Sequence, residues 1–88
     1  MLRLNRSNLS YQQFEDKIYV LTTQSNSLHE LNGTASQIFL WLWNEEEVTE
    51  PMLVTRIGER YEVDEAKARE HLALFLADLR GKGILLPE

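Results

Sequence analysis

Apolar and polar residues alternate along the first third of the chain, which is the pattern of β-strands. Residues 9–14 (LSYQQF) alternate in this way, and residues 18–23 (IYVLTT) are rich in β-branched and aromatic residues. The polar residues 15–17 between them have the length of a hairpin turn. After a second turn at residues 24–27, the stretch 28–31 (LHEL) can form a short third strand. The sequence therefore predicts a small antiparallel meander.

The spacing of apolar residues then changes to that of a helix. Asn32 is a good N-cap residue, so the third strand is expected to run directly into the first helix. An apolar stripe at helical spacing follows, and it consists of Ala35, Ile38, Phe39 and Leu42. We expect Trp41 and Trp43 to flank this stripe at the margin of the core, with Leu40 pointing away from it.

Two further helices are expected after the acidic loop at residues 45–47. Thr49 can cap the second helix, with Pro51 in its first turn. The expected buried line of that helix is Leu53, Ile57 and Tyr61. Asp64 can cap the third helix, which ends at Gly81 or Gly83. The core stripe of the third helix is Ala68, Leu72, Phe75, Leu76 and Leu79. A second line shares one flank beside it, formed by Lys67, His71, Leu74 and Asp78.

These elements predict an α+β fold, in which a three-stranded antiparallel meander is followed by three helices in a winged-helix-like order. The chain has 88 residues, which suits a single domain spanning residues 1–88. A winged-helix outline often accompanies DNA binding, but the outline alone does not decide function.

Charge and composition exclude or disfavour several classes of function. Acidic residues outnumber basic residues 14 to 9, and the net charge is −5, which disfavours binding to nucleic acid. Because no apolar run approaches the roughly 20 residues of a membrane span, no membrane segment is expected. The N-terminal residues lack a secretory signal, and a cytoplasmic location is therefore expected.

Candidate catalytic chemistry is sparse. The chain contains no cysteine, and its two histidines, His29 and His71, have no carboxylate motif at metal-ligand spacing around them. There is neither a glycine-rich phosphate loop nor a serine in a nucleophile elbow. We therefore expect a protein that is not an enzyme and that carries no catalytic residue, metal or cofactor.

One family shares the order and spacing of these motifs over roughly residues 9 to 86. The motifs are Leu31-Asn32, Thr34-Ala35, Ile38, Thr49, Tyr61, Phe75-Leu76, Leu79 and Gly83-Ile84-Leu85. In these residues the chain resembles the PqqD-like family, named for pyrroloquinoline-quinone (PQQ) synthesis protein D, the prototype of the recognition element for ribosomal precursor peptides (RiPPs). Two features depart from the family pattern. His71 stands where relatives often have an acidic residue, and the loop NEEE replaces a tighter turn.

The resemblance implies a peptide chaperone. In relatives, the leader of a precursor peptide adds as an extra strand beside the third strand and lies against the third helix. Transferred to this chain, the expected peptide-binding residues are Leu28, His29, Glu30, Leu31, Lys67, His71, Leu74, Phe75 and Asp78. The implied partners are the leader peptide and a maturation enzyme, in relatives often a radical S-adenosylmethionine (radical SAM) protein. An unpaired strand edge is normally a liability, so an open edge is consistent with such use.

Two alternatives remain at this point. The same fold could serve as a structural or regulatory subunit that binds a folded partner, or as a winged-helix DNA binder, which the charge disfavours. The sequence leaves open which peptide is bound, which modification follows, which maturation enzyme acts and whether PQQ synthesis is the pathway. It also leaves open whether the chain is a monomer or a homodimer.

Overall fold

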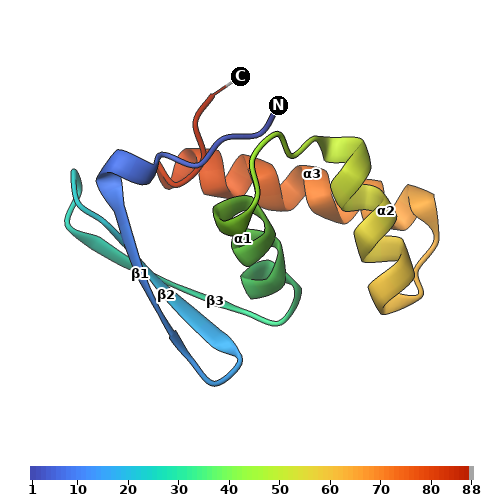
Figure 1. Cartoon of the computed structure of the whole chain (residues 1–88), viewed down its shortest axis with the longest axis horizontal. Coiled ribbons are helices and arrows are strands. Elements are labelled where there is room, and N and C mark those ends of the chain that lie inside the picture. Colours follow the sequence, from blue (N-terminus) through green and yellow to red (C-terminus); the bar gives the residue numbers. More distant parts are fainter. Residues whose placement is uncertain (88) are drawn as a thin grey trace.

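The computed structural model of the chain describes residues 1–87. In chain order its elements are a short 3-10 helix η1 (Arg6–Asn8), strands β1 (Leu9–Phe14), β2 (Lys17–Thr22) and β3 (Ser27–Asn32), and helices α1 (Thr34–Asn44), α2 (Glu50–Tyr61) and α3 (Glu65–Gly81). Figure 1 shows α1 lying between the sheet and the pair formed by α2 and α3. The predicted α+β order of an antiparallel meander followed by helices is confirmed.

The sheet of the described chain has the order β1–β2–β3, and both pairings are antiparallel. Strand β3 has six residues, as many as β1 and β2, so the expectation of a third strand shorter than the others was wrong. Its extra residues are Ser27 and Asn32, which pair with Thr22 and Lys17. Pairing through the backbone extends the strand beyond its apolar residues because it does not depend on side-chain polarity.

The two faces of the sheet differ in burial. Ile18, Val20 and Leu31 are buried on the face that turns towards the helices. The helices α1, α2 and α3 lie on that side of the sheet in Figure 1. The side chains of alternate residues point to the opposite face, and Leu28 on that face remains 67% exposed. The sheet therefore has one covered face and one open face.

The junction between β3 and α1 differs from the expected one. Asn32 ends the strand, and the N-cap is Gly33, which has φ 58° and ψ −130° and no side-chain cap. A positive φ of this kind is readily accessible only to glycine. The hydroxyl of Ser36 donates to the Gly33 carbonyl over 2.8 Å and to the Asp16 carbonyl over 3.1 Å. The Asn32 cap was wrong because strand pairing retains Asn32 in β3.

Helix α1 carries the aromatic part of the core. Ile38, Phe39 and Leu42 are buried, as expected. The ring of Tyr11 meets the Phe39 and Trp43 rings edge-on, with centroids 5.2 and 4.9 Å away. These contacts join β1 to α1, since aromatic rings prefer edge-to-face geometry at such distances.

The caps predicted for α2 and α3 are confirmed. The Thr49 hydroxyl accepts from the Met52 amide over 3.4 Å, and the Asp64 carboxylate accepts from the Lys67 amide over 2.8 Å. Helix α3 ends at Gly81, one of the two expected end points. Its core stripe is buried as expected except for Phe75, which is half-buried.

The expectation that Tyr61 is buried was wrong. Tyr61 is exposed at the end of α2, and Val54 joins Leu53 and Ile57 in the core. Burial at a helix end depends on the neighbouring elements as well as on helical spacing.

The N-terminal segment completes the core in a way that the sequence did not predict. Leu2 and Leu4 are both 5% exposed, and they form isolated bridges with Val48 and Leu85. Further backbone bonds join this segment to the C-terminal residues, including one from the Leu86 amide to the Arg3 carbonyl over 2.8 Å. The two ends of the described chain therefore lie side by side (Figure 1).

An ion pair links the loop after α1 to α2. Arg56 donates two hydrogen bonds to the Glu45 carboxylate over 2.5 and 2.7 Å, and its guanidinium lies 5.6 Å from the Trp41 ring centre. The hydrogen bonds from Arg56 lower the pKa of Glu45 below its ordinary value. The folded state therefore favours the ionised carboxylate, and the associated stability is lost as the pH falls through the lowered pKa.

We predict that Glu45→Gln makes the stability of the protein less sensitive to acid. Between about pH 6 and pH 3, the wild-type protein should lose more unfolding free energy than the variant. The difference should stay below about 1 kcal/mol, because the pair is partly exposed. Urea unfolding at several pH values measures it, with Glu46→Gln at the exposed neighbouring position as the control. Equal pH slopes for Glu45→Gln and wild type would contradict the prediction.

Candidate functional site

Strand β3 presents an edge that no other strand of the described chain pairs with. It is one of the two outer strands of the sheet, next to β2. Its side chains alternate between the two faces. His29 and Leu31 point towards the helices, whereas Leu28 and Glu30 are exposed on the open face. Leu31 is only 4% exposed and belongs to the core. The backbone edge is therefore not paired with another described strand, and the four predicted β3 residues range from exposed (Leu28 and Glu30) to buried (Leu31).

His29 occupies the middle of β3 on the inner face. It is half-buried, and its Nε2 lies 3.5 Å from the hydroxyl of Thr22 on the neighbouring strand. That hydroxyl is buried and lies 2.7 Å from the Ser25 hydroxyl. The imidazole thus lies beside Thr22 on the inner face of the sheet.

The flank of α3 predicted from helical spacing is exposed to solvent. Lys67, His71, Leu74 and Asp78 are all exposed, and Leu74 is 68% exposed. The Asp78 carboxylate accepts from the Lys82 ammonium over 2.8 Å, one turn further along the helix. The flank therefore combines one large apolar side chain with charged and titratable neighbours.

An apolar cavity of about 230 Å³ lies where α1, α2 and α3 meet. It is lined by Thr34, Ala35, Ile38, Ile57, Tyr61, Val63, His71, Leu72 and Phe75. His71 and Phe75, both predicted site residues, line the same cavity. Thr34 and Ala35 follow β3 directly after Gly33, so the cavity lies next to the C-terminal end of that strand. It thereby connects the end of β3 with the flank of α3.

The sequence reasoning missed Tyr61 and Val63 as candidate site residues. Both flank the end of α2, and Asp64 then caps α3. Two apolar residues around a helix end, just before a new cap, are a weak signal of a cavity wall. The cavity itself is assembled from separate helices, so no local pattern reveals it.

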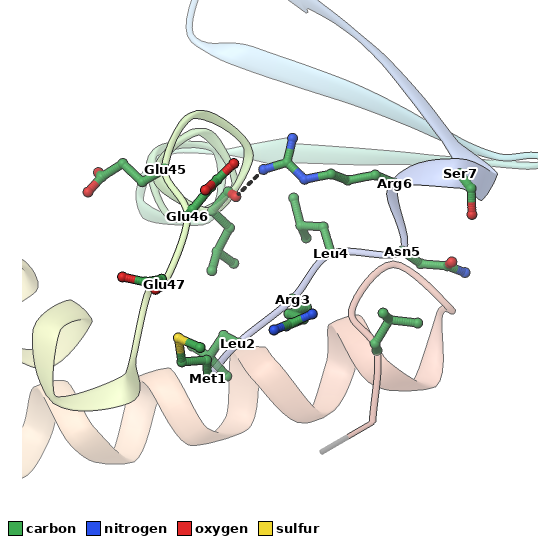
Figure 2. Close-up of a pocket in the computed structure, with 12 residues that line it drawn as sticks. Met1, Leu2, Arg3, Leu4, Asn5, Arg6, Ser7, Glu45, Glu46 and Glu47 are labelled. Carbon is green, nitrogen blue, oxygen red and sulfur yellow. Dashed lines mark hydrogen bonds between the residues drawn. The ribbon is translucent and has the colours of Figure 1, made fainter.

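A larger cavity of about 520 Å³ lies on another part of the molecule. Residues 1–7, Leu42, residues 45–47 and Leu86 line it. Figure 2 shows Arg6 extending towards the end of α1, where its Nη2 donates to the carbonyls of Leu42 and Trp43 over 3.0 and 2.6 Å. Arg6 thus stabilises the C-terminal end of α1. None of the predicted peptide-binding residues lines this cavity.

Two further properties concern residues 1–87. No helix among them is both long enough and apolar enough to span a membrane. No group of three or more His, Cys, Asp or Glu side chains in the same part of the chain could hold a metal ion.

Comparisons with known proteins assign the family. The model of the family described as coenzyme PQQ synthesis protein D (PqqD) matches residues 18–85. No curated protein matches the chain.

Two solved structures share its fold. The first, "TbiB1 in Complex with the TbiA(beta) Leader Peptide", has 21% sequence identity and a TM-score of 0.89, and the match covers 98% of this chain and 96% of that one. The second, "Lasso peptide synthetase B1 complexed with the leader peptide", has 26% identity and a TM-score of 0.84, with 98% of both chains covered. With the family model matching most of its length, the chain belongs to the PqqD family.

Proposed function

We propose that this protein binds the leader segment of a ribosomally made precursor peptide and presents that peptide to a maturation enzyme. One observation carries the proposal: the unpaired edge of β3 ends beside an apolar cavity whose wall includes α3. Two solved structures with the same fold are complexes with leader peptides, which supports this proposal.

The expected binding mode follows from the chemistry of the β3 edge and of the apolar cavity. An exposed strand edge offers backbone N–H and C=O groups to an extended peptide, which adds to the sheet through main-chain hydrogen bonds. Side-chain pockets then supply specificity. At about 230 Å³, the cavity is smaller than the range of roughly 300–1,000 Å³ typical of small-molecule sites. It suits an apolar side chain that projects from an extended peptide.

The proposed site combines the edge of β3 with the flank of α3. Leu74 and Phe75 would contact apolar side chains of the leader, and His71 would line the rim of the cavity with Tyr61. Lys67 and Asp78 would border the site with charge. His29, Glu30 and Leu28 would offer their backbone groups to the peptide, while Leu31 would support the edge from the core.

In this proposal the protein is a non-catalytic chaperone, and the chemistry belongs to its partner. Holding the leader raises the effective concentration of the rest of the precursor at the enzyme, which accelerates modification without any new contact. A radical SAM enzyme is one candidate partner. It would bring its own iron–sulfur cluster, since this chain has no cysteine. Because precursor peptides are made on ribosomes, we place this step in the cytoplasm.

An NMR titration tests the proposal. We expect that the synthetic leader of a precursor encoded beside this gene shifts the backbone amides of β3, of the α3 flank and of the cavity wall. The same peptide with alternate backbone amides methylated should bind far more weakly, because it cannot complete the strand ladder. Shifts confined to other surfaces, or equal affinity of the methylated peptide, would overturn strand addition at β3.

A further inference from the structure

The open face of the sheet carries an apolar row that ends at the free edge of β3. Leu28 on β3 pairs directly with Leu21 on β2, and the next outward pair is Glu30 with Tyr19. Leu21 and Tyr19 are half-buried although no helix of the described chain covers this face, whereas Leu28 and Glu30 are exposed. The two exposed side chains thus stand last in their rows, beside the unpaired edge.

A peptide strand added to β3 would continue both rows. Residues paired across neighbouring strands point to the same face of a sheet, and their Cβ atoms lie about 4.5–5.5 Å apart. One outward side chain of the peptide would therefore lie beside Leu28, and another, two positions away, would lie beside Glu30. The intervening residue would point inwards on the side of His29.

We propose that the protein reads its peptide on both faces of the added strand, with Leu28 and Glu30 selecting the outward side chains. This inference rests on the proposed function and specifies the substrate class. The bound segment carries an apolar residue and a basic residue two positions apart, the first beside Leu28 and the second beside Glu30. An apolar neighbour would cover the exposed Leu28 side chain, and a cation would complement the Glu30 carboxylate. The net charge of −5 also favours association with a basic peptide.

The test is a parallel selection from a displayed library of random twelve-residue peptides against the full chain. Four proteins are compared with wild type: Leu28→Lys, Glu30→Lys, Leu74→Glu and Gln12→Lys. Gln12 is the matched control because it is exposed on the same open face, in the row of Glu30, but on β1 at the far edge. Leu74→Glu identifies the peptides whose binding depends on the α3 flank.

Wild type and Gln12→Lys should select the same pair of outward residues, one apolar and one basic. With Leu28→Lys the preference at the apolar position should change to acidic, and with Glu30→Lys the basic preference should change to acidic. Each selected peptide should bind the mismatched variant up to about fivefold more weakly, because cross-strand pairs contribute about 0.2–1 kcal/mol. The inward positions should keep their preference throughout.

Two results would overturn this inference in distinguishable ways. If the selected peptides lose binding with Leu74→Glu but show the same outward preferences for all other variants, the proposed function stands and the open face is not read. If wild type selects no peptide, or only peptides whose binding none of the substitutions on β3 and α3 weakens, the proposed function fails and the inference fails with it. Analytical ultracentrifugation tests whether a second copy of the chain covers the open face of the sheet instead of a peptide. A wild-type dimer that Leu28→Lys dissociates would assign this face to a second copy and contradict the proposal.

Discussion

Replacing Leu74 with glutamate should weaken leader binding at least tenfold without unfolding the protein. Burying a leucine side chain against a ligand is worth about 1.5–3 kcal/mol, and about 1.4 kcal/mol is a tenfold change in affinity. The substitution also brings a carboxylate into an apolar contact. Leu74 is 68% exposed in the free protein, so the unfolding free energy should change by about 0.5 kcal/mol or less. Fluorescence anisotropy with a labelled leader peptide measures the affinity.

Ala73→Glu provides the control for added charge on the same helix. Ala73 is exposed, but it lies about 100° around the helix from Leu74, away from the predicted flank. It should retain the affinity of the wild-type protein within about twofold. If Leu74→Glu also retains wild-type affinity for a peptide that binds β3, the flank of α3 is not part of the peptide site.

The largest loss of stability is expected for Phe39→Ala. The Phe39 side chain is fully buried in α1 and packs against Tyr11 and Trp43. Truncating a buried phenylalanine typically costs about 3–5 kcal/mol, which includes the cavity that remains. A domain of this size has a total stability of about 5–15 kcal/mol, so the variant should be close to unfolding. Urea unfolding followed by tryptophan fluorescence measures the loss.

The same substitution at the exposed residue Phe14 tests whether the loss of stability depends on burial of the side chain. Phe14 ends β1 and is 65% exposed, so Phe14→Ala should change the unfolding free energy by only about 0.5 kcal/mol. A loss below about 1 kcal/mol at Phe39, or equal losses at both positions, would contradict the packing described for α1.

Local patterns predicted the strands, the helices and two caps because each depends on residues a few positions apart. The Thr49 and Asp64 caps bond to amides three residues further along, which a sequence displays directly. The Asn32 cap failed because the end of β3 is decided by pairing with Lys17 on another strand. The burial of Leu2 and Leu4 was missed for the same reason, since their partners are Val48 and Leu85.

The features of the candidate site that depend on nearby residues could likewise be predicted, and those that depend on several elements could not. The spacing of Lys67, His71, Leu74 and Asp78 on one helix indicated a shared flank beside the core stripe, and all four residues are exposed. The cavity could not be predicted, because residues from α1, α2 and α3 form it together. Likewise, alternation along β3 separates Leu28 from Leu31, but only the position of the helices decides which one is buried.

The bridge between Leu4 and Leu85 has a consequence for the order of folding. On the ribosome, the two hairpins of the meander can form early, since they join neighbouring segments. Leu4 precedes the meander in the chain, but it can pair with Leu85 only when that residue emerges. Closing so long a loop is slow compared with local pairing. We therefore expect the sheet edge to exist on the nascent chain before the domain is complete, with Leu4 still unpaired.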